Sequence, residues 1–178
     1  MTAGHDSPRP VRCSGCSARV ADVAGPAHPY MTGAAGCWQE FSELTAELTD
    51  PAVLRLATDA YAVQHPHGGA VERRQRQSVG VHLTSLCLHL EHGVPEQRMR
   101  RVVNSISRKV LPRLGRDDWP ALVPPTDLGP VTVLDVRGAA PEQRADATRR
   151  WAASVWTAWS DAHRTVDDWA RAVLAEGK

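Results

Sequence analysis

Three cysteines near the N-terminus have the spacing of metal ligands. Cys13 and Cys16 form a CxxC motif with Gly15 between them, and Cys37 opens the first predicted helix. The glycine lets the backbone turn so that both sulfurs can reach one ion. A helix N-terminus favours the thiolate form of a cysteine, which is the form that binds metal. Three thiolates leave one position of a tetrahedral site to be filled.

Two histidines are candidates for the fourth ligand. His28 is the nearer in sequence and would complete a self-contained loop site. A hairpin of two helices over 37–48 and 51–65 favours His65 instead, because the chain would climb about 17 Å, return about 21 Å and end beside Cys37. We therefore predict a Zn²⁺ site, with His28 as the alternative fourth ligand, formed by Cys13, Cys16, Cys37 and His65.

Two other interpretations of the CxxC motif do not need a metal. A thioredoxin-type redox pair follows a strand, and we expect no strand before Cys13. Reduced cysteines without a ligand role are the second interpretation, since stable disulfides are rare in the cytoplasm. Cys87 lies among leucines and is typical of a small buried hydrophobic residue rather than a nucleophile.

Composition argues against several classes of partner. The net charge is +1 and 23% of residues are charged, so no overall field favours nucleic acid or a membrane surface. The arginines between 98 and 116 lack interleaved aromatic residues and are typical of a solvated helix face, so we expect no nucleic-acid partner. No apolar run approaches the roughly 18 to 20 residues that span a bilayer, and the start lacks an export signal. We expect a cytoplasmic protein without a membrane partner.

Hydrophobic periodicity predicts a mostly α-helical, single-domain bundle of about five helices. The stretch VTVLDV at 131–136 is β-branched and is a candidate short strand, although it has no evident partner. The predicted organisation is a disordered tail over 1–12 and one domain over 13–178, which contains a zinc-binding loop at 13–36, a helical hairpin at 37–65, two helices at 77–112 and a long C-terminal helix at 141–175.

Two histidines fall on helix faces that should be buried. His82 lies in the third predicted helix, and His163 follows Trp156 by seven residues on the tryptophan-lined side of the last helix. Each could be a core-edge histidine that hydrogen-bonds a backbone carbonyl. Alternatively, they belong to a polar pocket with acid–base or substrate-binding groups. The pocket would include Gln64 and Asp167, and its candidate catalytic residues are His82, His163, Tyr61 and Asp59.

The motifs CSGC, AHPYMTGAAGCWQEF, DAYAVQHP and QSVGVHLTSLCLHLEHG resemble those of a bacterial family of uncharacterised proteins, catalogued as a domain of unknown function. The resemblance covers most of residues 13–175. It implies that the CxxC, the helix-opening cysteine and the histidine of QHP are shared features, and it implies no activity. A looser similarity to DinB-like metalloenzymes extends to the fold only, because their HxxxH pair is absent.

Two functions from different classes follow. The first is an enzyme of hydrolase, lyase or transferase type that acts on a small molecule, with His82 or His163 moving the proton. The second is a binding or interaction module with a purely structural zinc. Three thiolates and one imidazole occupy all four positions of a tetrahedral zinc ion, so we expect any catalysis to take place in the histidine pocket and not at the metal. We favour the enzyme, because titratable groups recur on faces that should be buried.

Overall fold

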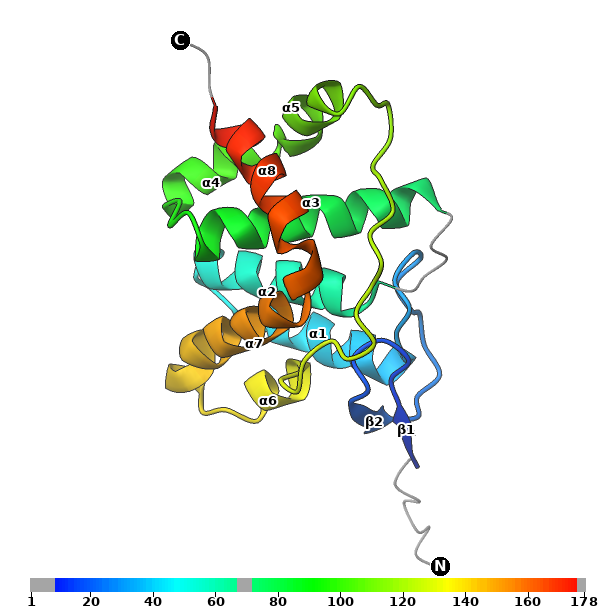
Figure 1. The fold of residues 1–178 in the computed structure, drawn as a ribbon. Helices are drawn as coiled ribbons and strands as arrows, with labels where there is room; N and C mark the ends of the chain where they lie inside the picture. The colour runs from blue at the N-terminus through cyan, green and yellow to red at the C-terminus, as the bar shows by residue number, and fades with distance from the viewer. Residues whose placement is uncertain (1–8, 67–71, 176–178) are drawn as a thin grey trace, which may run out of the picture.

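Helices make up most of the chain over residues 9–66 and 72–175, which a computed structural model describes (Figure 1). The predicted mostly α-helical fold class is confirmed, with eight α-helices in these ranges rather than about five. The elements are β1 (Pro10–Arg12), β2 (Arg19–Ala21), α1 (Ala35–Glu47), α2 (Pro51–Gln64), α3 (Arg73–Leu90), α4 (Glu96–Val103), α5 (Ile106–Arg113), α6 (Val133–Arg137), α7 (Arg144–Ala158) and α8 (His163–Leu174), with 3₁₀ turns η1 (Pro141–Gln143) and η2 (Ser160–Ala162).

The N-terminal cysteines lie in a β-hairpin rather than in an irregular loop. β1 and β2 are antiparallel, and Val11 lies opposite Val20. The zinc-binding loop predicted over 13–36 therefore contains a strand at 19–21, and the end of the predicted tail over 1–12 is a strand, so a strand does precede Cys13. Strands of three residues are too short to show alternation in a sequence. Residues 1–8 of the predicted tail lie outside the described residues.

α1 and α2 form the helical hairpin predicted over 37–65. The buried residues Cys37, Phe41 and Leu44 lie on one face of α1 at the spacing of an amphipathic helix. α2 begins where the Asp50 carboxylate accepts a hydrogen bond from the N–H of Ala52 at 2.8 Å. The hairpin brings the end of α2 back to the start of α1.

The region predicted as two helices over 77–112 contains three. α3 begins at Arg73, and the second predicted helix is divided into α4 and α5. Where the two helices meet, the Ser105 hydroxyl donates to the carbonyl of Val102 at 2.7 Å. Such a bond between a side chain and the backbone competes with the hydrogen bonds that would continue the helix. Met99 in α4 and Ile106 in α5 are both fully buried.

The candidate strand at 131–136 is wrong, because this segment forms the short helix α6. Thr132 and Asp135 make a capping box, in which the Asp135 carboxylate accepts from the backbone N–H of Thr132 at 2.7 Å. Local capping therefore outweighs the β-branched composition of a segment that has no neighbouring strand to pair with.

The predicted long C-terminal helix at 141–175 is also wrong, because the chain turns at Trp159 between α7 and α8. A straight helix of that length would extend about 50 Å and leave much of its apolar face unburied. Trp159 is 1% exposed and its indole N–H donates to the carbonyl of Val63 at 3.0 Å. Beyond this turn α8 crosses α3 (Figure 1).

α2 lies at the centre of the packing, with α7 and α3 as its main neighbours, and α3 in turn packs against α8. The core contains the fully buried tryptophans Trp119, Trp151 and Trp159. A long irregular segment runs along one side of the molecule from α5 to α6 (Figure 1). None of the helices in the described ranges is long and apolar enough to cross a membrane.

Candidate functional site

The turn of the β-hairpin holds Cys13 and Cys16 side by side. The N–H of Cys13 donates to the carbonyl of Ala18 at 2.8 Å, and the N–H of Ser17 donates back to the carbonyl of Cys13 at 2.9 Å. Ser17 has a left-handed backbone with φ of 64°, which closes the turn. Both sulfurs consequently face the helices, and the two cysteines are 1% and 6% exposed.

The helical hairpin supplies the other two side chains of the cluster. Cys37 lies in the first turn of α1 and His65 at the C-cap of α2, and they are 0% and 1% exposed. His65 Nε2 lies 3.5 Å from the Cys13 sulfur and 3.4 Å from the Cys37 sulfur, and the sulfurs of Cys16 and Cys37 are 3.7 Å apart. All four donor atoms lie within 4.8 Å of one another. This buried cluster can hold a metal ion.

The ring of His65 is fixed by contacts on its far side. Its Nδ1–H donates to the carbonyl of Tyr61 at 2.7 Å, one turn earlier in α2, so Nε2 is the nitrogen that faces the sulfurs. Tyr61 stacks on the imidazole with ring centroids 4.0 Å apart, and Phe41 stacks on the other face of Tyr61. A backbone carbonyl that fixes the tautomer in this way is a common outer partner of metal-binding histidines.

Gly15 lets the hairpin approach His65 closely. A Cβ at this position would lie 2.3 Å from Cδ2 of His65 and 2.6 Å from the carbonyl oxygen of Thr32. Both distances are shorter than real Cβ contacts, so glycine is required for this approach. Gly15 is therefore needed for the close contact with His65 as well as for the freedom of the backbone in the CxxC turn.

Crowding of the sulfurs separates their pKa values. Hydrogen bonds from Cys16 and Cys37 lower the pKa of Cys13, whereas the same contacts from Cys13 and Cys16 raise the pKa of Cys37. Burial lowers the pKa of His65, but its contacts with Cys13 and Cys16 outweigh this effect and raise the pKa to about 9. A buried group of three thiolates repels itself unless a cation is present.

His28, the alternative fourth ligand, lies apart from this ligand set. Its ring packs edge-on against Tyr30 and Trp38, with centroids 4.3 Å and 4.9 Å away. Burial and the charge of nearby His82 lower the pKa of His28. The structure therefore brings His65, and not His28, to the three sulfurs.

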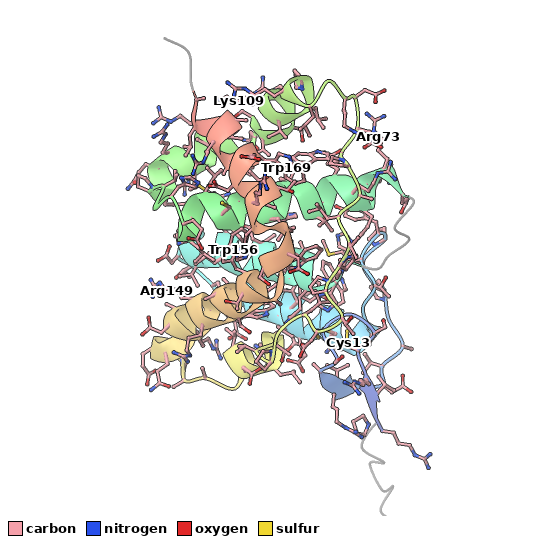
Figure 2. All side chains as sticks on the ribbon, viewed as in Figure 1. Cys13, Arg73, Lys109, Arg149, Trp156 and Trp169 are labelled. Carbon is pink, nitrogen blue, oxygen red and sulfur yellow. The ribbon has the colours of Figure 1, made fainter. Side chains whose placement is uncertain are left out.

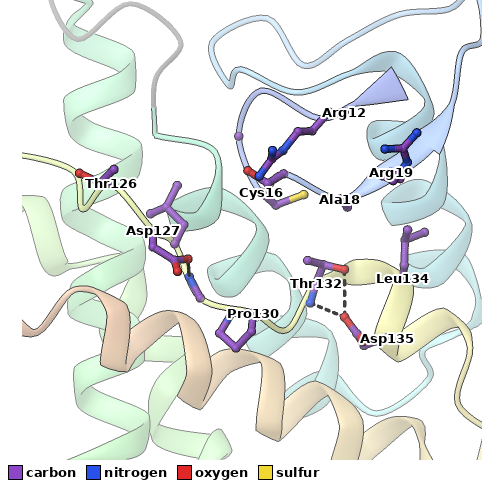
Figure 3. A pocket seen from close by; sticks show the side chains of 14 residues that line it. Arg12, Cys16, Ala18, Arg19, Thr126, Asp127, Pro130, Thr132, Leu134 and Asp135 are labelled. Carbon is purple, nitrogen blue, oxygen red and sulfur yellow. Dashed lines mark hydrogen bonds between the residues drawn. The ribbon is translucent and has the colours of Figure 1, made fainter. Parts of the chain in front are cut away.

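A cavity of about 580 Å³ borders the cluster at Cys16 (Figure 3). Arg12 and Arg19 of the hairpin lie on one side of it, and Asp127 and Asp135 lie on the other (Figure 3). Both carboxylates accept hydrogen bonds from the backbone of their own turns. These two acids therefore serve the local structure of the segment that leads to α6.

Asp59 and His82 form a hydrogen-bonded pair between α2 and α3. His82 Nδ1 donates to one carboxylate oxygen of Asp59 at 2.7 Å, and the Ser85 hydroxyl donates to the other at 2.6 Å. We assign the proton to Nδ1 because an ionised carboxylate can only accept. Asp59 is 3% exposed, so these partners hold its orientation inside the protein. Nε2 of His82 has no hydrogen-bond partner in the part of the chain that the structure describes.

His82 lines a cavity of about 430 Å³ between α3 and the loop that carries Tyr30. Sequence reasoning missed two serines associated with His82. Ser78, four residues earlier, lines the same cavity, and Ser85, three residues later, binds Asp59. Their helical spacing from His82 was the available signal. The residues that line this cavity are Tyr30, Arg74, Gln77, Ser78, Val81 and His82.

His163 is not part of this arrangement. It stacks on Trp156 with ring centroids 4.0 Å apart, and its Nε2 donates to the Trp156 carbonyl at 2.8 Å. Trp156 lies where α7 and α8 meet, and Cys13 lies at the hairpin (Figure 2). These contacts agree with the interpretation of His163 as a histidine at the edge of the core whose ring hydrogen-bonds a backbone carbonyl.

The remaining residues of the predicted pocket also have separate partners. Tyr61 belongs to the surroundings of the cysteine cluster, as described above. The amide of Gln64 donates to the carbonyls of Leu128 and Val131, and its oxygen accepts from the indole N–H of Trp151 at 2.9 Å. Of the four candidate catalytic residues, therefore, only Asp59 and His82 form a hydrogen-bonded pair.

A second group of metal-ligating types lies near the C-terminal end of α3. The donor atoms of Cys87, His92 and Asp167 lie within 4.8 Å of one another. Asp167 is already bonded to His92 at 2.9 Å and to Arg171 at 2.7 Å. Burial and the negative charge of Asp167 raise the pKa of Cys87 to about 12, so its thiol stays protonated at neutral pH. We assign these contacts to structure.

The fold and the cluster define a helical domain whose N-terminal hairpin meets two helices at a set of three cysteines and one histidine. The chain belongs to a family of unknown function (DUF5946), whose sequence model matches residues 11–160 and so includes the whole cluster. The predicted membership of an uncharacterised family is thereby confirmed. No curated protein and no solved structure matches the chain.

Proposed function

We propose that Cys13, Cys16, Cys37 and His65 bind Zn²⁺. A tetrahedral zinc with Zn–S about 2.3 Å and Zn–N about 2.0 Å has S···S edges of about 3.8 Å and S···N edges of about 3.5 Å. The contacts of 3.7, 3.5 and 3.4 Å within the cluster agree with these edges. The donor set of three soft thiolates and one imidazole also suits zinc better than a hard cation.

The proposed zinc is structural. Its four protein ligands leave no open position, and each is buried to 6% exposure or less. When bound, the ion supplies a cross-link between the hairpin, the start of α1 and the end of α2. The hairpin buries Ala18 and Val20 against the core, and strands of only three residues add few hydrogen bonds, so the cross-link would strengthen the attachment of the hairpin to the helices.

We further propose that the protein is an enzyme that acts on a small molecule, with His82 as its acid–base group. The Asp59–His82 hydrogen bond beside a cavity is the observation that carries this proposal. Asp59 holds the imidazole in the tautomer whose Nε2 can accept a proton from a bound substrate, and its charge stabilises the imidazolium that results. Ser85 keeps the carboxylate of Asp59 in place for this role.

This function can be tested by incubating the zinc-loaded protein with a mixture of cellular metabolites and following their consumption by mass spectrometry. His82→Gln removes the titratable group, and His163→Gln is the matched control for loss of a partly buried histidine. We expect at least one metabolite to be consumed by the wild type and by His163→Gln but not by His82→Gln. Equal consumption by all three would contradict a role for His82, and consumption by none would favour a binding module.

A further inference from the structure

One face of α3 forms a wall of the cavity that His82 lines. Arg74, Gln77, Ser78, Val81 and His82 recur at intervals of three and four residues, so they lie along a single stripe of the helix. Tyr30 lines the cavity together with this stripe. A ligand in the cavity therefore lies along the first half of α3.

Ser78 provides the first sign of the ligand's chemistry. The residue is 7% exposed, and its hydroxyl has no hydrogen-bond partner among the described residues. An unpaired buried hydroxyl is destabilising, so such groups normally have a partner. The hydroxyl oxygen itself is covered, but Ser78 belongs to the wall of the cavity, so a rotation about its χ1 would bring the hydroxyl to an acceptor on a bound ligand.

The charge of the cavity provides the second sign. Arg73 and Arg76 both form ion pairs with Asp118. Arg74 lies in the first turn of the same helix, is exposed, and has no ion-pair partner in the part of the chain that the structure describes. Among the described residues that line the cavity there is no carboxylate, and the positive end of the α3 dipole adds to the field of Arg74.

The wall is also richer in hydrogen-bond donors than in acceptors. A guanidinium can only donate, while the hydroxyls of Ser78 and Tyr30 and the amide of Gln77 can each donate as well as accept. An oxyanion is the ligand type that accepts several such bonds at once, and charge-assisted bonds are the stronger ones.

We infer that this cavity binds the oxyanion of a small substrate, a phosphate ester or a carboxylate, through Arg74 and Ser78. The inference rests on the proposed role of His82 and names the class of substrate for that site. Ser78 lies one helical turn, about 6 Å along the axis, from His82. The anionic group is thus held about one turn from the atom whose proton His82 moves, which sets the separation between the anionic group and the reacting atom of the substrate.

The test is a titration of the ¹⁵N-labelled, zinc-loaded protein, followed by two-dimensional NMR at constant ionic strength. Inorganic phosphate and acetate are the two anionic probes, and glycerol is the neutral one. We expect saturable shifts of the Gln77 and Ser78 amides with at least one anion and none with glycerol. The anion that binds more tightly distinguishes a phosphate ester from a carboxylate.

Variants separate a built site from general attraction of anions. Arg74→Gln is expected to weaken anion binding by about tenfold, the loss of one charge-assisted hydrogen bond, and Ser78→Ala to weaken it to a smaller extent. Arg98→Gln, at an exposed position on α4, is the matched control and should leave binding unchanged. Equal weakening in Arg98→Gln, or shifts with glycerol equal to those with the anions, would overturn the inference.

A second readout distinguishes failure of this inference from failure of the proposed function. Long-range ¹⁵N–¹H correlations of the neutral His82 ring report its tautomer in the wild type and in Asp59→Asn. If His82 is the Nδ1–H tautomer only when Asp59 is present, but no anion binds, the substrate is not anionic and the acid–base pair still stands. A wild-type ring with its proton on Nε2 would overturn both.

Discussion

Replacing Gly15 with alanine is expected to disrupt the metal site without removing any ligand. The new Cβ would lie 2.3 Å from the ring of His65 and 2.6 Å from the carbonyl of Thr32, and the second contact is with backbone, which cannot rotate away. Either the imidazole or the CxxC turn must therefore move. Because both carry ligands, zinc binding and folding stability should fall together.

The size of the effect follows from the cost of overpacking. One extra methyl group in a close-packed region typically costs about 1 to 3 kcal/mol. For a chain of this size each kcal/mol corresponds to about 2 to 4 °C in Tm, so the expected decrease is about 2 to 12 °C. Thermal unfolding followed by circular dichroism, and zinc transfer to a colorimetric chelator, measure the two consequences.

Gly25→Ala is the matched control. Nothing lies within 4 Å of a Cβ built at Gly25, which is in the same N-terminal segment. Both variants lower the entropy of the unfolded chain in the same way, so the difference between them in Tm and in zinc retention reports the clash with His65. Equal Tm values and equal zinc retention in Gly15→Ala and Gly25→Ala would show that the close approach of Gly15 to His65 does not constrain the site.

Three further perturbations test the packing around the site and the bundle. Tyr61→Phe should keep zinc, because the imidazole of His65 is bound by the backbone carbonyl of Tyr61 and not by its phenol. Tyr61→Ala should lower the free energy of unfolding by about 3 to 5 kcal/mol and weaken zinc retention. A Tyr61→Phe variant without zinc would contradict this expectation. Gln64→Leu leaves the partners of the Gln64 side chain unpaired, the indole N–H of Trp151 among them. The free energy of unfolding, measured in urea, should fall by about 1 to 3 kcal/mol for each unpaired group. An unchanged value would show that these hydrogen bonds contribute nothing to stability. The hydrogen bond from Arg55 lowers the pKa of Glu96, so the stability that this pair contributes is complete above the unfolded pKa of about 4.3 and is lost as the pH falls through the folded pKa. Glu96→Gln should therefore destabilise the protein at pH 7 by up to about 1 kcal/mol and by less at pH 3, and the opposite order would contradict the assignment.

Local sequence signals were sufficient for the helical class and for the approach of His65 to Cys37. Amphipathic spacing and the Asp50 cap define α1 and α2, and the lengths of these helices fix which ends meet. Such features depend on residues within one or two helical turns, and a sequence shows them directly.

The features that the sequence did not indicate depend on tertiary contacts. The turn at Trp159 exists because its indole is buried against Val63, and no residue near it in sequence is a helix breaker. The β-hairpin was hidden because its strands are too short to alternate. The sequence placed His82 and Asp59 in one predicted pocket, but which of the pocket residues bond to each other depends on the packing of α2 against α3.

The metal content of the purified protein shows whether the three cysteines and His65 bind one zinc ion. Elemental analysis of the wild type, His28→Ala and His65→Ala separates the two candidate histidines. We expect about one zinc ion per chain in the wild type and in His28→Ala, and well below one in His65→Ala. A wild-type protein without stoichiometric zinc would rule out the zinc site, and a His65→Ala variant that retains zinc would rule out His65 as its ligand.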